Sequence, residues 1–210
     1  MLYFKTLPKI LMPDENGNYI ILTNLLARAT LIEGLQDNPM LFYKYTIQDG
    51  DTPEIVADKY YGDSYRYWIV LYSNQILDPV WQWPMQYNQF LDYLDSKYAE
   101  EAAAANVTPY IYTQQTVYEY QKIIKTKDDN TDNEKINIVS VTQSEYANII
   151  SSVTTVSIPS GGSCTITIDK TIKYVYDYEY DLNESRREIK LLDSFYAVQM
   201  EEQLYSLMSK

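Results

Sequence analysis

Hydrophobic and polar residues alternate most regularly near the C-terminal end of the chain. From position 172 to 182, isoleucine, tyrosine and leucine fill every second position, and the positions between them are mostly charged. A period of two places successive side chains on opposite faces, so the pattern predicts a β-strand with one aromatic face. Residues 183–185 are expected to turn the chain into a partner strand over 187–192. The aromatic face, with Tyr174, Tyr176, Tyr178 and Tyr180, is expected to pack in the domain's own core, with a contact to a neighbouring protein as the alternative.

Shorter patterns divide the rest of the chain into segments. Residues 1–42 are interrupted by prolines and a turn signal, and they are expected to form an N-terminal arm with little regular structure. Residues 81–106 begin with aromatic residues and contain a run of alanines just before Asn106, which predicts a linker followed by a helix. Residues 107–192 contain short runs of Tyr, Val, Ile and Thr and predict a β-rich region. Residues 193–210 have the apolar spacing of a C-terminal helix.

The segment from 43 to 80 has the clearest start and stop signals. Alternating apolar residues over 43–47 predict a strand, and the run Asp49-Gly50-Asp51 predicts a turn. Thr52 is expected to cap a helix whose first position is Pro53, and Gly62 is expected to end it.

A second helix is expected over residues 64–73, with Asn74 after its last turn. Ile76 and Leu77 are then expected to return beside the first strand. The segment therefore predicts a small β-α-α-β module, and the whole chain an α+β fold that adds the helical linker, the β-rich region and the terminal helix.

This segment resembles a LysM module. The matching positions are Gly50-Asp51-Thr52, Ile55-x-Ala57, Tyr61-Gly62, Trp68 and Asn74. LysM modules bind N-acetylglucosamine polymers between the loop after the first strand and the loop before the last. The resemblance places that groove at Gly50, Asp51, Thr52, Pro53, Gln75, Ile76, Leu77 and Asp78.

The flanking sequence resembles the LysM-containing baseplate wedge subunits of T4-like contractile-tailed phages. The matching stretches are Tyr3-Phe4-x-x-Leu7-Pro8, Thr23-Asn24-Leu25-Leu26-x-Arg28, residues 42–54, Gly62-Asp63-x-x-x-x-Trp68 and Asn183-Glu184-x-Arg186-Arg187-x-Ile189-x-Leu191-Leu192. Residues 127–171 match no part of that pattern and are interpreted as an insertion. The resemblance implies a structural protein of the virion tail, assembled in the host cytoplasm, that clamps neighbouring wedges into a sixfold ring. Its implied partners are other wedge subunits, including the large dimeric one and the small lysozyme-like sheath-initiating one.

The aromatic composition is consistent with a protein that contacts neighbours. The chain has 23 tyrosines, 4 phenylalanines and 3 tryptophans. Tyrosine is enriched both in strands and at interfaces, so both readings stay open. Trp81 and Trp83 are candidate interface anchors, because tryptophan is common among binding hot spots. Arg186 and Arg187 belong to the densest basic group and join them as candidates.

The charge argues against two classes of partner. The net charge is −12 at pH 7, and the basic residues are scattered. An acidic chain repels nucleic-acid phosphates and anionic lipids. No stretch approaches the ~20 apolar residues that span a bilayer, and no signal peptide is expected.

The chain lacks most of the residues that carry common enzyme chemistry. It has no histidine, no phosphate-binding glycine loop and a single cysteine, Cys164, which is expected to be a small apolar core residue. Asp49 and Asp51 are better explained as a solvated turn than as a catalytic pair. The loop Asp128-x-Asn130-x-Asp132 departs from a calcium loop at Asn133 and Val139. We therefore expect no enzyme activity, metal or cofactor, and a sugar-binding LysM protein remains the alternative function.

Overall fold

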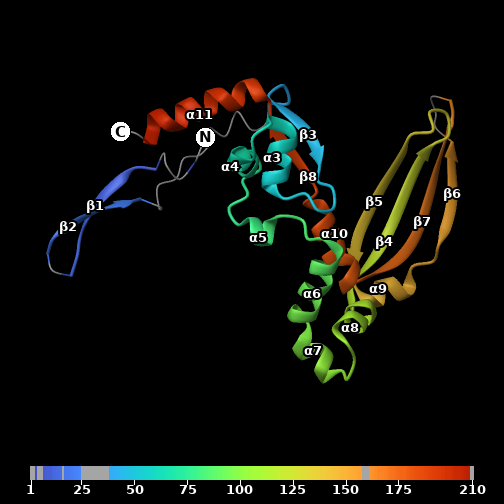
Figure 1. Cartoon of the computed structure of the whole chain (residues 1–210). Helices are drawn as coiled ribbons and strands as arrows, with labels where there is room; N and C mark the ends of the chain where they lie inside the picture. The colour runs from blue at the N-terminus through green and yellow to red at the C-terminus, as the bar shows by residue number, and fades with distance from the viewer. Residues whose placement is uncertain (1–2, 4–6, 16, 25–37, 158–160, 209–210) are drawn as a thin grey trace. The chain divides into compact units, whose positions relative to one another are not determined.

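The computed structural model describes residues 3, 7–15, 17–24, 38–157 and 161–208 (Figure 1). The fold is α+β, with small antiparallel sheets and a C-terminal helix. The chain forms two compact units. Unit 1 comprises residues 1–86 and 183–210, and unit 2 comprises residues 87–182. Among the described residues, no helix has the length and apolar character needed to cross a bilayer.

Unit 1 is built around a two-stranded antiparallel sheet. Its strands are β3 (Phe42–Thr46) and β8 (Glu188–Leu192), with Tyr43 opposite Leu191 and Tyr45 opposite Ile189. Between them in sequence come α3 (Pro53–Tyr61), the short 3-10 helix η1 (Ser64–Arg66) and α4 (Tyr67–Ser73). The helix boundaries agree with the sequence signals. The Thr52 hydroxyl accepts a hydrogen bond from the Ile55 backbone N–H at 3.3 Å, and Gly62 ends α3 with φ of 68°.

The expected return strand at Ile76 and Leu77 is wrong. The chain turns at Gln75, which has φ of 55°, and Leu77 is 77% exposed. Residues 79–82 then form α5 (Pro79–Gln82). The partner of β3 comes instead from β8, where Ile189, Leu191 and Leu192 are buried. A five-residue strand that buries three apolar side chains stabilises the sheet more than a two-residue segment ending in Asp78-Pro79.

Two apolar clusters form the core of unit 1. The first contains Trp68, Ile69, Leu192, Ala197 and Leu204, so it joins α4 to the terminal helix α11 (Ser194–Met208). The second lies under α3 and the sheet and contains Ile47, Val56, Ala57, Val70, Trp83, Ile189 and Leu191. The terminal helix agrees with the sequence prediction.

The N-terminal segment contains a β-hairpin, where the sequence predicted an arm with little regular structure. β1 (Lys9–Pro13) pairs antiparallel with β2 (Tyr19–Thr23). The Asp14 carboxylate closes the turn by accepting a hydrogen bond from the Asn18 backbone N–H at 2.7 Å, and Gly17 adopts φ of 82°. The prolines that suggested an irregular arm lie at the strand end and just before the first strand. Residues 25–37 of the expected arm lie outside the described part of the chain.

Unit 2 combines three helices with a four-stranded antiparallel sheet and a short connecting helix, and it ends in α10. The helices are α6 (Tyr87–Lys97), α7 (Ala99–Ala104) and α8 (Pro109–Gln115). The sheet has the order β5-β4-β7-β6, with β4 (Val117–Asp128), β5 (Glu134–Val141), β6 (Ser152–Ser157) and β7 (Ser163–Tyr174), and α9 (Gln143–Asn148) connects β5 to β6. None of the residues in these four strands is fully buried.

The predicted strand over residues 172–182 is mostly a helix. β7 ends at Tyr174, and α10 (Val175–Ser185) follows at once. The buried residues of this helix are spaced four apart, at Val175, Glu179 and Asn183. The buried face therefore includes Glu179, which the strand prediction placed on the charged face. The tyrosines also have helical spacing. Tyr176 and Tyr180 stack with ring centroids 6.2 Å apart, and both contact Phe90 of α6.

Candidate functional site

The loop after β3 is organised around the carboxylate of Asp51. Tyr45 Oη donates to it at 2.7 Å, the Gln48 backbone N–H at 3.1 Å and Lys59 Nζ at 2.6 Å. Asp51 is only 7% exposed. Burial alone would raise its pKa, but the hydrogen bonds from Lys59, Tyr45 and Gln48 favour the charged form and bring the pKa below its usual range. Burial and the bond to Asp51 raise the pKa of Tyr45 to about 12.

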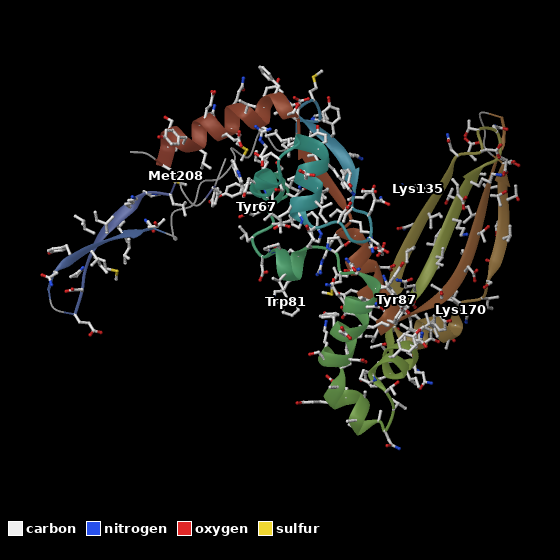
Figure 2. The ribbon with its side chains drawn as sticks, in the orientation of Figure 1. Tyr67, Trp81, Tyr87, Lys135, Lys170 and Met208 are labelled. Carbon is white, nitrogen blue, oxygen red and sulfur yellow. The ribbon has the colours of Figure 1, made fainter. Side chains whose placement is uncertain are left out.

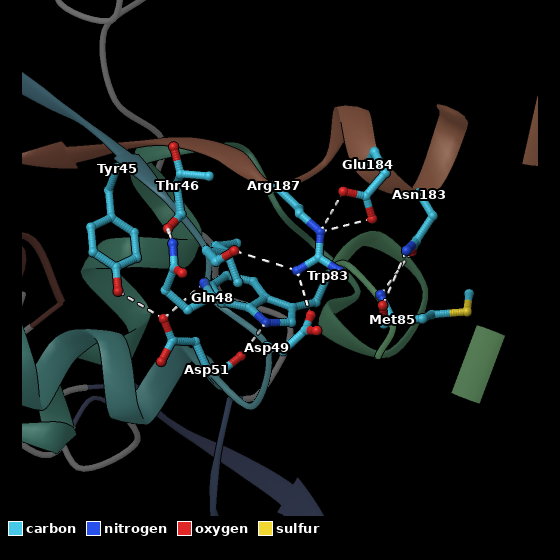
Figure 3. A network of polar contacts seen from close by, with 11 residues as sticks. Tyr45, Thr46, Gln48, Asp49, Asp51, Trp83, Met85, Asn183, Glu184 and Arg187 are labelled. Carbon is cyan, nitrogen blue, oxygen red and sulfur yellow. Dashed lines mark hydrogen bonds and ion pairs between the residues drawn. The ribbon is translucent and has the colours of Figure 1, made fainter. Parts of the chain in front are cut away.

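Trp83 fills the space beside this loop (Figure 3). Its indole Nε1–H donates to the Asp51 carbonyl oxygen at 2.8 Å, and the residue is only 8% exposed. The short helix α5 precedes it in the chain. Asp78 caps α5 by accepting from the Val80 N–H at 3.0 Å, and the Gln82 side chain accepts from the Leu77 and Asp78 N–H groups. The segment after α4 therefore carries Trp83 onto the first loop.

Arg187 closes the other side of the loop (Figure 3). Its Nη1 lies 2.8 Å from the Asp49 carboxylate and 3.4 Å from the Ile47 carbonyl oxygen, and its Nε donates to Glu184 at 2.8 Å. Asp49 is thus held in an ion pair with the strand-entry residue of β8. The Asp49 and Asp51 carboxylates each bind a different cation, so they do not form a pair that shares a proton.

Two asparagines fasten the distant parts of the chain to this module. Asn74 Nδ2 donates to the Lys190 carbonyl oxygen at 2.8 Å, and its Oδ1 accepts from the Lys190 N–H at 2.7 Å. Asn183 makes the same pair of bonds to Met85, at 3.0 Å and 2.8 Å. Asn74 belongs to the LysM-like pattern, but no local signal in the sequence indicates that its partner is Lys190.

The two groups of residues expected to form a sugar groove, 50–53 and 75–78, make different contacts in the structure. Gly50 to Pro53 lie in the loop and at the start of α3, with Asp51 in contact with Trp83. Ile76 packs partly against the second cluster, its N–H donating to the Leu71 carbonyl oxygen at 2.9 Å, and Leu77 and Asp78 lead into α5. The loop that immediately precedes the last strand is the one that carries Arg187.

The four candidate interface anchors separate into two groups. Trp81, labelled in Figure 2, is 59% exposed on α5, and its carbonyl oxygen accepts a hydrogen bond from Arg186 at 2.7 Å. Trp83 is only 8% exposed, and Arg187 is held by Asp49 and Glu184, so both side chains make contacts within the module. The role of all four residues as interface anchors stays a prediction.

Unit 2 contains a buried carboxylate that was not predicted from the sequence. Glu179 of α10 is 3% exposed and accepts hydrogen bonds from Lys97 Nζ at 2.7 Å, Tyr98 Oη at 2.7 Å and Tyr93 Oη at 3.1 Å. Burial alone would raise its pKa, but these donors lower it. A carboxylate that accepts three hydrogen bonds and has a lowered pKa is suited to a structural ion pair. A general acid requires a raised pKa. Its only sequence signal is its helical spacing from Val175.

The remaining candidate chemistry is also accounted for by local structure. Asp128 accepts a hydrogen bond from the Asn130 N–H at 2.9 Å, and Asp132 pairs with Lys127 at 2.8 Å. Among the described residues, no group of three or more cysteines or carboxylates is arranged to hold a metal ion. Cys164 is half-buried on β7 rather than in a core.

Comparison of the sequence with models of protein families and with curated proteins finds no match.

Proposed function

We propose that the chain is a non-catalytic structural subunit of a contractile phage tail baseplate, which holds neighbouring wedges together. Unit 1 contains β3, α3, α4 and β8, an arrangement similar to that expected for a LysM module, and β8 is separated from the two helices by residues 76–187. The observation that carries the proposal is that this chain's own Trp83 and Arg187 fill the loop that takes sugar in LysM modules. The resemblance of the flanking motifs to baseplate wedge subunits supplies the biological setting.

The filled loop disfavours a sugar-binding role. A sugar ring needs exposed hydrogen-bonding groups and an open apolar surface. Here the Asp51 carbonyl oxygen is bonded to Trp83, and the Ile47 carbonyl oxygen is bonded to Arg187. Displacing Trp83 to admit a ligand would expose a buried indole and leave a buried acceptor without its partner, which makes binding unfavourable. The module therefore suits a scaffold better than a cell-wall ligand.

The exposed apolar surface of unit 2 supports a place within an assembly. On one face of the four-stranded sheet the half-buried Ile124 lies opposite the half-buried Ile168. On the other face the half-buried Ile123 lies opposite Ile138, which is 55% exposed. A sheet in a free-standing domain normally buries at least one face against another layer. In the described part of this chain neither face contains a fully buried residue. Large exposed apolar surfaces of this kind are typical of protein interfaces.

The composition of purified tails tests the proposal. Tail particles from cells producing the phage that encodes this chain would be purified on a density gradient, and their proteins counted by quantitative mass spectrometry. The proposal predicts the chain in the tail fraction at a copy number divisible by six, whereas recovery only with cell-wall fragments would contradict it.

A further inference from the structure

The β1–β2 hairpin is apolar on both of its faces. The register places Ile10, Met12, Ile20 and Leu22 on one face, and Leu11, Tyr19 and Ile21 on the other. These seven side chains are each between 40% and 72% exposed. A two-stranded hairpin is at best marginally stable alone in water, and these exposures leave much of both faces open. The hairpin therefore requires a partner that covers both faces at once.

The hydrogen-bond pattern shows which edge of the hairpin is suited to pairing. The Asn24 N–H donates to the Pro8 carbonyl oxygen at 2.8 Å, and the Asp14 N–H to the Asn18 carbonyl oxygen at 2.7 Å. Because bonded and non-bonded pairs alternate in an antiparallel ladder, the odd-numbered residues direct their backbone groups outward. On β1 this outer row ends in Pro13, which has no N–H to donate. On β2 the outer row consists of Tyr19, Ile21 and Thr23, and each offers both a donor and an acceptor.

A lipid bilayer cannot be the partner of this hairpin. The outward backbone groups of β2 would remain unpaired in hydrocarbon, at a cost of several kcal/mol each. A neighbouring strand pairs all of them. The chemistry of the edge thus selects a protein with an open strand edge.

A second copy of the chain also fails to provide the required surroundings. Pairing two hairpins through β2 gives a four-stranded sheet whose two faces are still apolar and exposed. No residue in the unit 2 sheet is fully buried, so its edges are not enclosed by two apolar layers. The β3–β8 sheet exposes Lys44, Lys190 and Glu188 on one side. None of the described sheets of a second copy offers a slot that is apolar above and below the pairing strand.

We propose that the hairpin is a strand-donating arm whose β2 edge extends a sheet inside an apolar slot of a different protein of the tail particle. This inference rests on the proposed function, and it adds the kind of surface on the partner protein that binds the hairpin. The seven side chains expose on the order of 700 Å², close to the ~800 Å² that one partner contributes to a standard interface. Strand addition supplies affinity through main-chain bonds, and the side chains on both faces supply specificity.

The test compares two proline substitutions that differ in the edge they affect. Leu11 and Ile21 lie directly opposite each other on the same face, and both direct their N–H outward. Ile21→Pro removes a donor from the β2 edge, and Leu11→Pro removes one from the β1 edge, with a similar loss of apolar surface. We expect Ile21→Pro to lower incorporation of the full chain into tail particles at least about tenfold, and Leu11→Pro less than about threefold. Equal effects of the two substitutions would overturn strand pairing through β2.

A crosslinking measurement on the wild-type backbone keeps the inference testable even if a proline variant misfolds. Replacing Tyr19 with p-benzoylphenylalanine and irradiating purified particles should join the chain to one different tail protein. A crosslink between two copies of the chain, or no protein crosslink in particles that contain it, would overturn the inference alone. Absence of the wild-type chain from the particles would overturn the proposed function and, with it, the named partner.

Discussion

The side chain of Asn74 binds both backbone polar groups of Lys190, a residue 116 positions later in the chain. Its Nδ2 also donates to the Val70 carbonyl oxygen at 2.8 Å. One side chain thus ends α4 and holds β8 in register beside β3. This contact joins the two parts of a module that residues 76–187 separate in sequence.

Replacing Asn74 with alanine should therefore destabilise unit 1. The loss of three hydrogen bonds is expected to lower the free energy of unfolding by about 2–3 kcal/mol, measured by urea denaturation. Asn137→Ala, on an exposed position of β5, is the matched control and should change stability by less than about 0.5 kcal/mol. Equal effects of the two substitutions would show that the hydrogen bonds of Asn74 do not add to the free energy of unfolding.

Trp83 and Trp81 offer a second matched pair, two residues apart. Trp83→Ala should cost about 3–5 kcal/mol, because it removes a buried ring from the second apolar cluster. Trp83→Phe keeps most of the bulk but leaves the Asp51 carbonyl oxygen without its donor, and should cost about 1–3 kcal/mol. Trp81→Ala removes an exposed ring and should leave stability within about 0.5 kcal/mol of the wild type. A large loss of stability from Trp81→Ala in the isolated chain would contradict these assignments.

The lowered pKa of Asp51 predicts how unit 1 responds to acid. Its folded-state pKa lies below the unfolded value, so its stabilising contribution is present above the unfolded pKa and is lost as pH falls through the folded pKa. The difference in unfolding free energy between the wild type and Asp51→Asn should be largest near neutral pH and should shrink below about pH 4. Urea denaturation at several pH values measures it. A difference that stays constant down to strongly acidic pH would show that the charge of Asp51 is not the cause.

Glu179 should be the most sensitive carboxylate of unit 2. Glu179→Gln removes the charge that faces Lys97 and two tyrosine hydroxyls, and is expected to destabilise unit 2 by about 2–4 kcal/mol. Glu100→Gln on the exposed surface of α7 should have an effect below about 0.5 kcal/mol. Hydrogen exchange of the α6 and α10 amides reports on unit 2 separately from unit 1. Unchanged protection in Glu179→Gln would mean that the buried ion pair does not hold these helices together.

Local signals in the sequence predicted the helices of unit 1 well. Thr52, Pro53 and Gly62 act within one helix, so their effect is visible in a short window of sequence. The pairing of β3 with β8 could not be predicted in this way. It depends on contacts between residues more than 140 positions apart, such as Tyr45 and Ile189. Trp83 likewise lies in a segment predicted as an aromatic linker, because nothing nearby in sequence indicates that it packs on Asp51.

The error at residues 175–182 has a different physical origin. Tyrosines at every second position satisfy a strand pattern, but Tyr176 and Tyr180 also satisfy a helical one. The deciding contacts are those that bury Glu179 against Lys97 and Tyr98 and the packing of Tyr176 on Phe90. They come from α6 and from Tyr98, the residue just before α7. Tertiary contacts therefore decided between two periodicities that the sequence allowed.

A melting scan with chitotetraose tests most directly the claim that the chain's own side chains fill the LysM-like loop. A ligand at 100 times its dissociation constant stabilises a folded protein by about 2.7 kcal/mol, which raises the melting temperature by several degrees. The account predicts no shift for the wild-type chain at millimolar chitotetraose. A shift of several degrees that Trp83→Phe alters would show that the groove opens to sugar, and would contradict the account.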